Sequence, residues 1–544
     1  MTSTSTLRDA AFRWIADDPD DSTRAELQDV LARAMGGEAG AAGELADRMA
    51  GPLEFGTAGL RGPVRAGPNG MNVAVVTRTT AGVAEWLTAH GHAGALVVIG
   101  RDARHGSEAF ATAAAEVLIA AGFDVKVFPK PLPTPVLAFA VGRLGAVAGI
   151  QITASHNPPA DNGYKLYDAT GGQIVPPSDG EIERAIQAAP AAVSMPRAPG
   201  AEVVDLLDAY LDEVATLPMG AERAVRVAAT ALHGVGADTL RAAFERAGFT
   251  DLHLVGDQAA PDPDFPTVSF PNPEEPGATD LLLALASDVD ADLAVALDPD
   301  ADRCALGVRD SGGEWRMLRG DETGVLLGSY ILSTVDRTLL PDPLVATTIV
   351  SSSMLGEIAN AEGARYAETL TGFKWLVRAG EGLVFAYEEA LGLCVNPGFV
   401  RDKDGIAAAT LAAGYTARLK AEGRTPLDVL DELARRHGVH LTDQVSLRVT
   451  DLAVRGQLMA KVREAPPAEL GGVEVTLEVL LPDADVLRLT GEGLRVVIRP
   501  SGTEPKLKAY LQVVAPVTGS LAEARDAATA KLSALRTAVE ELLA

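Results

Sequence analysis

Short apolar runs alternate with helix-like patterns over most of the 544-residue chain. In the first part, strands are predicted at 95–99, 123–128 and 147–153, with helices at 106–121 and 136–143 between them. Apolar strands that alternate with helices are typical of a parallel sheet. This part of the chain is therefore predicted to form an α/β domain.

The same alternation starts again twice. The second unit runs from the apolar strand that ends at Leu232 to the one that ends at Leu297, and the third contains the strands that end at Val350 and Tyr387. No sequence repeat accompanies the repeated arrangement. We therefore predict three similar α/β domains with mainly parallel mixed sheets.

After about Gly438 the pattern changes to strand-like alternation. The segments VSLRVTDL, VEVTLEVLL and LRVVIR alternate apolar and polar residues, and a helix is predicted from Leu521 to the end. This texture predicts a smaller α+β domain at the C-terminus. The predicted organisation is a helical extension followed by domains I to IV, at 1–50, 51–205, 206–318, 319–438 and 439–544.

Charge and composition narrow the classes of function. Lys and Arg number 47 against 74 Asp and Glu, which gives a formal net charge of −27 at pH 7. A chain this acidic is not expected to bind nucleic acid or an anionic membrane, and it should repel small anions unless cations gather in one place. The two cysteines exclude a disulfide scaffold and a thiolate zinc site. Because we see neither a signal peptide nor an apolar run near 18 residues, we expect a cytoplasmic protein without a membrane span.

The strand that ends at Thr153 leads into the polar segment ASHNPP. Ligands of open α/β sheets bind where strands end. A hydroxyl beside an imidazole, Ser155 and His156, could be an activated nucleophile, and Lys165 could stabilise transferred charge or carry a proton. The alternative is that Ser155 only caps a turn, since Ser, Asn and Pro are turn formers. No G-x-S-x-G motif is present, which argues against an α/β-hydrolase.

Three carboxylates follow the strand that ends at Leu297, at Asp298, Asp300 and Asp302. At every second position of an extended backbone they point to one side, where they would repel each other without a cation. Oxygen ligands alone favour Mg²⁺. An EF-hand is excluded, because Arg303 stands where its loop requires Gly. A solvated acidic turn is the remaining alternative.

Three further loops carry polar groups that are weaker signals. The pair Glu388 and Glu389 follows a predicted strand and could accept hydrogen bonds from sugar hydroxyls. In the last domain, RPSGTEP offers Arg499, two hydroxyls and a glycine to a phosphate, although a Pro/Gly turn explains this segment equally well. Near the start, FGTAGLRG combines a glycine-rich backbone with Arg61 but lacks the Lys and the spacing of a P-loop.

Taken together, these segments resemble the α-D-phosphohexomutase superfamily, which includes phosphoglucomutases and phosphomannomutases. TASHNP, DPDADR, YEEALG and RPSGTEP occur in the family's order, one in each predicted domain. The resemblance covers the chain from about Gly51 to the end. FGTAGLRG, FKW and RDKDG look most like the branch that contains phosphopentomutases, glucose-1,6-bisphosphate synthases and bacterial phosphoglucomutases.

The resemblance implies a role for each group of residues. Ser155 would carry the phosphoryl group and complete a Mg²⁺ site with Asp298, Asp300 and Asp302. The transferring phosphate would be surrounded by Arg61, His156, Lys165 and Arg303. The sugar and its second phosphate would be bound by Lys374, Glu388, Glu389, Arg499, Ser501, Gly502 and Thr503.

The implied reaction is the interconversion of glucose 1-phosphate and glucose 6-phosphate, with mannose phosphates as further candidate substrates. It would proceed through phosphoserine and a sugar 1,6-bisphosphate, with His156 or Lys165 as general base. Mg²⁺ and glucose 1,6-bisphosphate, or the matching sugar bisphosphate, would be cofactor and activator. The only expected partner is the phosphosugar, and the expected assembly is a monomer or a homodimer.

Two departures from the family pattern bear on these expectations. Ala390 stands where many members have Ser, which removes one potential sugar contact. This loss leans toward a phosphopentomutase as the alternative, and a glucose-1,6-bisphosphate synthase is a separate alternative from another class of enzyme. Pro299 replaces the usual Gly of the metal loop, which should stiffen the loop without removing a ligand.

The net charge of −27 is then compatible with a phosphate ligand if the positive and negative side chains occupy different parts of the molecule. Six cations from loops of all four predicted domains are expected to surround one central cleft: Arg61, Lys165, Arg303, Lys374, Arg499 and Lys506. The excess acid would then cover the outside of the molecule and favour solubility.

Overall fold

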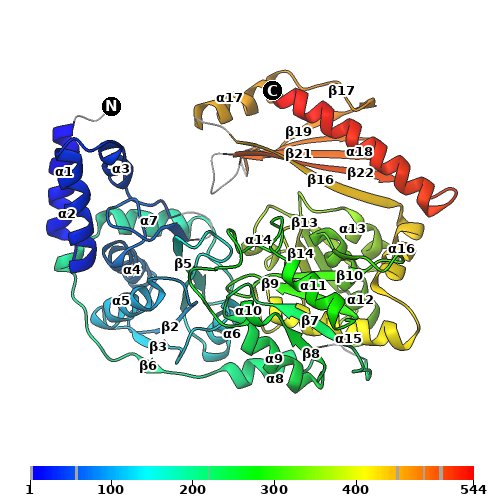
Figure 1. Cartoon of the computed structure of the whole chain (residues 1–544), viewed down its shortest axis with the longest axis horizontal. Coiled ribbons are helices and arrows are strands. Elements are labelled where there is room, and N and C mark those ends of the chain that lie inside the picture. The colour runs from blue at the N-terminus through cyan, green and yellow to red at the C-terminus, as the bar shows by residue number, and fades with distance from the viewer. Residues whose placement is uncertain (1–3, 56–58, 218–219, 449–451, 482–483, 501–505) are drawn as a thin grey trace. The chain divides into compact units, whose positions relative to one another are not determined.

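The computed structural model describes residues 4–55, 59–217, 220–448, 452–481, 484–500 and 506–544 (Figure 1). The chain forms two compact units. Unit 1 comprises residues 1–219, 223–309 and 396–413, and unit 2 comprises residues 220–222, 310–395 and 414–544. Three of the described helices lie in the segment expected to be helical, namely α1 (Thr4–Asp17), α2 (Asp21–Met35) and α3 (Ala41–Arg48).

The first sheet of unit 1 has the strand order β1-β5-β4-β2-β3-β6. Its central strand β2 pairs in parallel with β3 and β4, whereas β5 runs antiparallel to β4 and to β1. The strands are β1 (Leu60–Pro63), β2 (Leu96–Arg101), β3 (Asp124–Val127), β4 (Ala148–Ile152), β5 (Asp161–Asp168) and β6 (Glu202–Val203). The associated helices are α4 (Val73–Ala89), α5 (Ser107–Ala120), α6 (Thr134–Leu144) and α7 (Ser178–Ala188).

Strand β5 is an element that the hydrophobic pattern did not single out. It contains the buried polar residues Asn162 and Lys165, which interrupt the apolar run. Lys165 pairs with Gln151 of β4, so this lysine is a strand residue and not a loop residue. Residues 153–160, which include Ser155 and form the serine loop, connect β4 to β5.

The second sheet of unit 1 contains β10, β9, β7 and β8 in that order. β7 is parallel to β8 and β9, whereas β10 returns antiparallel to β9, so the aspartate segment is the turn of a hairpin. The strands are β7 (Val227–Thr230), β8 (Leu252–Leu254), β9 (Leu293–Leu297) and β10 (Cys304–Arg309). The helices around them are α8 (Leu207–Val214), α9 (Gly236–Ala247), α10 (Gly256–Ala259) and α11 (Asp280–Asp288).

The first sheet of unit 2 has the order β13-β12-β14-β15. β12 is parallel to both neighbours, and β15 pairs antiparallel with β14. The strands are β12 (Leu344–Thr348), β13 (Arg365–Thr369), β14 (Leu383–Glu388) and β15 (Gly392–Cys394). Short β11 (Trp315–Met317) precedes the helices α12 (Gly320–Thr334), α13 (Met354–Ala361) and α14 (Phe373–Leu376), and α15 (Gly405–Ala421) and α16 (Pro426–His437) follow.

The C-terminal sheet of unit 2 is antiparallel, with the order β16-β22-β21-β20-β19. The long helix α18 (Leu521–Leu543) packs along β16 and β22 (Figure 1). The strands are β16 (Val439–Arg448), β19 (Thr476–Val479), β20 (Leu487–Gly491), β21 (Leu494–Pro500) and β22 (Lys506–Ala515). The remaining elements are α17 (Leu452–Glu464), β17 (Glu469–Leu470) and β18 (Val473–Glu474).

These sheets confirm the predicted fold class. Three of them have parallel strands at their centre and an antiparallel strand beside them, and the fourth is an antiparallel sheet covered by a helix. The predicted domain boundaries and the central cleft stay predictions. Within the described part of the chain, no helix has both the length and the apolar composition to cross a membrane.

The contact between α4 and α7 leads to a first prediction about stability. A Cβ atom at Gly82 of α4 would lie 2.6 Å from Ile186 Cγ1 and 2.7 Å from the Ile186 nitrogen. Because a backbone atom cannot yield as a side-chain end can, we expect Gly82→Ala to lower the free energy of unfolding by about 1–3 kcal/mol. The matched control is Gly142→Ala in α6, where the added Cβ would meet no described atom within 4 Å outside its helix. It should raise stability by about 0.5–1 kcal/mol. Urea unfolding of both variants checks the pair, and equal midpoints would contradict the packing argument.

Candidate active site

Ser155 occupies a strained turn between β4 and β5. Its φ of +53° is in the left-handed region, which a residue with a side chain adopts only when its surroundings hold it there. The backbone N–H of Ser155 donates to Thr153 Oγ1 at 2.9 Å, and its hydroxyl donates to Asp298 Oδ2 at 2.8 Å. Nδ1 of His156 lies 3.3 Å from the same hydroxyl oxygen. The fold of unit 1 thus brings the serine loop of one sheet to the aspartate hairpin of the other.

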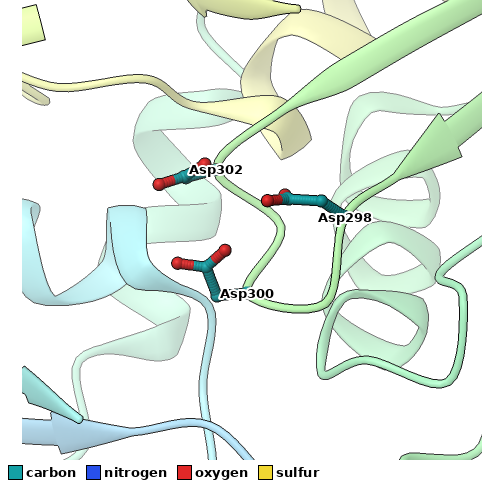
Figure 2. A group of neighbouring side chains, drawn as sticks. All are labelled: Asp298, Asp300 and Asp302. Carbon is teal, nitrogen blue, oxygen red and sulfur yellow. The ribbon is translucent and has the colours of Figure 1, made fainter. Parts of the chain in front are cut away.

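The aspartate hairpin turns all three carboxylates toward one common space (Figure 2). Asp298, Asp300 and Asp302 are fully buried, and one oxygen from each lies within 4.8 Å of the others. Gly405 packs against this turn, and its N–H donates to the Ala301 carbonyl at 3.2 Å. A Cβ atom at Gly405 would lie 2.4 Å from the Arg303 carbonyl oxygen, so only glycine fits there.

The donor set fits a hard divalent cation. Oδ1 of Asp300 and Oδ1 of Asp302 are buried and have no hydrogen-bond partner among the described residues. An unpaired buried carboxylate oxygen is costly. Such oxygens, together with the third carboxylate and a hydroxyl, are the ligands that Mg²⁺ prefers. The triad can therefore hold a metal ion.

The opposite oxygens of the triad face cations of the protein. Nζ of Lys165 lies 2.7 Å from Asp300 Oδ2 and 2.8 Å from Asp302 Oδ2. Burial alone would raise the pKa of Asp300, but the Lys165 ammonium outweighs it and holds this pKa below its ordinary value. Burial alone would lower the pKa of Lys165, and the two carboxylates outweigh it and raise this pKa. Lys165 is thus held as an ammonium ion at the triad.

Asp298 and His156 are each shifted toward the neutral form. Burial, followed by the charges of Asp300 and Asp302, raises the pKa of Asp298 well above its ordinary value. Burial, followed by the guanidinium charge of Arg303, lowers the pKa of His156 well below its ordinary value. Both shifts belong to the protein without an ion, and an added cation would stabilise the Asp298 carboxylate.

Two arginines predicted from the sequence complete the cationic side of the site. Arg61 lies on β1, opposite Gly163 of β5, and interacts electrostatically with the aspartates and with Arg303. Arg303 donates its backbone N–H to Asp298 Oδ1 at 3.0 Å, and its Nε lies 3.8 Å from Asp302 Oδ1. Unit 1 therefore gathers five predicted phosphate and nucleophile residues around the triad: Arg61, Ser155, His156, Lys165 and Arg303.

Some residues at the triad were not predicted as site residues. Nζ of Lys403 lies 3.3 Å from Asp302 Oδ2 and 3.4 Å from Asp402 Oδ1, and the Asp402 carboxylate also accepts from Tyr167 at 2.8 Å. Thr134 at the start of α6 donates to Asp300 Oδ2 at 2.6 Å. Lys403 belongs to the segment RDKDG, whose resemblance to the family was the signal that could have identified it. Thr134 had none, because its partner is 166 residues away.

The predicted sugar-binding residues lie in unit 2. Glu388 ends β14, and Glu389 accepts hydrogen bonds from Ser351 Oγ at 3.0 Å and Thr348 Oγ1 at 3.2 Å. Burial, followed by the charges of Glu388 and Asp321, raises the pKa of Glu389 to about 7. Glu389 is therefore oriented by two hydroxyls, one at the end of the neighbouring strand β12 and one in the loop that follows it.

The other predicted contacts of unit 2 are partly described. Lys374 is buried on α14, with its Nζ 5.2 Å from the centre of the Trp375 ring. Arg499 lies near the end of β21, opposite Lys508 of β22. Ser501, Gly502 and Thr503, predicted to bind phosphate, lie outside the described residues.

The fold and the triad define a class: an enzyme with three α/β domains, an α+β domain and a serine beside a divalent-cation site. Comparison with models of protein families identifies the family to which the chain belongs. They match as phosphoglucomutase/phosphomannomutase α/β/α domains I, II and III and the C-terminal domain, over residues 52–192, 208–313, 319–437 and 447–529. The chain belongs to the phosphoglucomutase/phosphomannomutase family and is an isomerase, a phosphosugar mutase.

Individual relatives carry different substrate names. The chain is 41% identical over 454 residues to a "Probable phosphomannomutase" of Haemophilus influenzae, covering 81% of this chain and 93% of the relative. It is 34% identical to the phosphopentomutase of Pongo abelii, over 85% of each chain. A solved structure from Thermus thermophilus that carries a phosphomannomutase name matches with a TM-score of 0.71 and 25% identity, covering 90% of this chain and 99% of that one. The family is thus shown, whereas the sugar differs among the relatives.

Proposed function

We propose that this protein is a phosphohexomutase that interconverts glucose 1-phosphate and glucose 6-phosphate through phosphoserine at Ser155 and glucose 1,6-bisphosphate. The observation that carries the proposal is the hydroxyl of Ser155, which donates to a buried aspartate of the triad at 2.8 Å. A serine held in this way beside a cation site is suited to accept and release a phosphoryl group.

In the proposed cycle, the phosphoryl group moves from Ser155 to the free hydroxyl of the bound sugar phosphate. The bond between Oγ and phosphorus breaks as the bond between the sugar oxygen and phosphorus forms. The proton of the sugar hydroxyl passes to His156, because Lys165 is already protonated beside Asp300 and Asp302. The resulting 1,6-bisphosphate turns over in the site and returns its other phosphoryl group to Ser155, which regenerates the phosphoserine. Arg61, Arg303 and Lys165 stabilise the negative charge of the phosphoryl oxygens.

Asp298, Asp300 and Asp302 would hold Mg²⁺, with an oxygen of phosphoserine as a further ligand. When bound, the cation supplies positive charge that stabilises the transferring phosphoryl group. The sugar bisphosphate is proposed as the activator, because it can phosphorylate a serine that has lost its phosphate. Lys374, Glu388 and Glu389 are proposed to bind the sugar, and Arg499 with Ser501, Gly502 and Thr503 the phosphate that does not react.

A phosphopentomutase is the second candidate. The relative from Pongo abelii named a phosphopentomutase is 34% identical over 85% of this chain, and Ala390 lacks the hydroxyl found in many family members. Loss of that hydroxyl removes a potential contact to a sugar, which weakens the argument for a hexose. Ribose or deoxyribose 1-phosphate would then be the substrate.

Steady-state rates on glucose, mannose and ribose 1-phosphate, each with and without Mg²⁺ and glucose 1,6-bisphosphate, test the proposal. We expect the highest kcat/KM on glucose 1-phosphate and stimulation by both additions. The highest kcat/KM on ribose 1-phosphate would establish the pentose alternative. Formation of the bisphosphate as the end product would contradict a mutase.

Arg499 leads to a prediction about substrate binding. If its guanidinium binds the phosphate that does not react, Arg499→Ala removes a charge-assisted contact worth about 1.5–3 kcal/mol. KM should then rise about 10–100-fold with little change in kcat, as initial rates over a range of substrate concentrations will show. Lys531→Ala on α18, which removes an exposed cation from the same domain, is the control. An unchanged KM in Arg499→Ala would refute the assignment.

A further inference from the structure

The side chain of Arg104 lies beneath the serine loop. This residue follows β2, and its side chain is only 1% exposed. Its two terminal nitrogens donate to four backbone carbonyls, three in the loop between β4 and β5 and one at the first residue of β5. The acceptors are the carbonyl oxygens of Ser155 at 2.7 Å, Asn157 at 2.6 Å, Pro158 at 2.8 Å and Asp161 at 3.1 Å.

These contacts act on the strained part of the loop. Residues with a side chain rarely adopt a φ of +53°, the value at Ser155. The peptide groups before and after Ser155 must therefore be held by their surroundings. On one side, the N–H of Ser155 donates to Thr153 Oγ1. On the other side, its carbonyl accepts from Arg104. The conformation that directs the hydroxyl to Asp298 is therefore held by one side chain on each side.

Arg104 is itself fixed by Asp102. Nε of Arg104 and Oδ2 of Asp102 form a buried ion pair at 3.4 Å, and Asp102 Oδ1 accepts from the Arg104 N–H at 3.0 Å and from Ser107 Oγ at 2.6 Å. The guanidinium also lies 4.9 Å from the centre of the Phe265 ring. A planar group with fixed donors, anchored in this way, imposes directions on its acceptors that apolar packing could not impose.

We propose that Arg104 is a positioning residue: anchored by Asp102, it holds the serine loop so that the Ser155 hydroxyl stays at Asp298. This inference rests on the proposed role of Ser155 as the phosphoryl carrier. Because all four acceptors are backbone carbonyls of the loop and of the first residue of β5, Arg104 acts through the position of Ser155. Its loss should slow phosphoryl transfer to and from Ser155 while substrate binding is retained.

The test compares Arg104→Met and Arg104→Lys with a matched control, Arg78→Met. A terminal nitrogen of Arg78 also donates to backbone carbonyls, those of Ile186 at 3.4 Å and Ala189 at 3.2 Å. These acceptors belong to unit 1 but lie at the C-terminal end of α7. For each protein we would measure kcat, KM and thermal midpoint. The rate at which glucose 1,6-bisphosphate phosphorylates Ser155 would be followed by intact mass and peptide mapping.

A displaced nucleophile loses about 100-fold in rate, so Arg104→Met should lose about that factor in kcat and in the rate of Ser155 phosphorylation. Its KM should stay within about 3-fold of wild type. Arg104→Lys, which keeps the charge but not the fork, should recover only part of the rate. Arg78→Met should lower the thermal midpoint and leave both rates within about 2-fold of wild type, since its acceptors lie away from the serine loop.

Wild-type rates in the folded Arg104→Met protein, or a loss only of thermal stability, would overturn the inference. If Arg104→Met does not fold, Arg104→Lys and Asp102→Asn decide, since each loosens the same support. An Asp102→Asn protein with a wild-type kcat would then also count against the proposal. The wild-type protein separates this inference from the proposed function: if glucose 1,6-bisphosphate does not phosphorylate Ser155 in it, the phosphoserine mechanism fails, whatever Arg104 does.

Discussion

Replacement of Ser155 by alanine is expected to abolish mutase turnover, with a loss of about 10⁴-fold or more. The substitution removes the oxygen that is proposed to carry the phosphoryl group, which is the hydroxyl that donates to Asp298 Oδ2 at 2.8 Å. Binding of the sugar phosphate should survive, since Lys374, Glu388, Glu389 and Arg499 are unchanged. The coupled assay for glucose 6-phosphate measures the first effect, and calorimetric titration with glucose 1-phosphate measures the second.

Ser194→Ala is the matched control for this experiment. Its hydroxyl donates to the Ala191 carbonyl at 2.7 Å in an exposed turn of the same unit. This control should retain wild-type turnover and show phosphorylation at Ser155. Near-normal turnover in Ser155→Ala would eliminate the phosphoserine mechanism, and incorporation of phosphate elsewhere in that variant would identify another carrier.

The order of domains and the central strands could be predicted because parallel strands are apolar on both faces. The five residues of β4 and the five of β9 are all buried, and such runs stand out in the sequence. Strand β5 did not stand out because Asn162 and Lys165 lie within it. Asn162 is satisfied by Ser107 Oγ and the His105 carbonyl, and Lys165 by two aspartates, all of them distant in the chain.

The candidate site divides in the same way. Ser155 and the three aspartates belong to the short motifs TASHNP and DPDADR. Neighbouring residues of each motif contribute to one site, so the residue types alone indicate a nucleophile and a cation site. Arg104 has no such signal, because its acceptors are backbone carbonyls, which any sequence supplies. Lys403 was visible within RDKDG but could be placed at Asp302 only when the packing of distant segments was known.

Asp300→Asn is expected to weaken Mg²⁺ binding by at least about 100-fold and to lower turnover about 10³-fold. Oδ2 of Asp300 accepts from Lys165 at 2.7 Å and from Thr134 at 2.6 Å, whereas its Oδ1 lacks a hydrogen-bond partner in the described part of the chain. In the variant, the amide oxygen should keep the two donors, which turns the NH₂ group toward the cation. A ligand is thereby replaced by a repelling donor, at a cost of several kcal/mol to metal-assisted transfer.

Thermal unfolding with increasing Mg²⁺ provides a readout that does not depend on turnover. A cation that binds only the folded protein raises the midpoint of wild type, and the rise should be lost in Asp300→Asn and in Asp302→Asn. Asp290→Asn is the control, because that carboxylate is 80% exposed and pairs with Arg309 at 2.8 Å away from the triad. Its midpoint should rise with Mg²⁺ as in wild type. An equal rise in the triad variants would place the metal elsewhere. Oδ1 of Asp300 and Oδ1 of Asp302, which lack a hydrogen-bond partner among the described residues, would then not be its ligands.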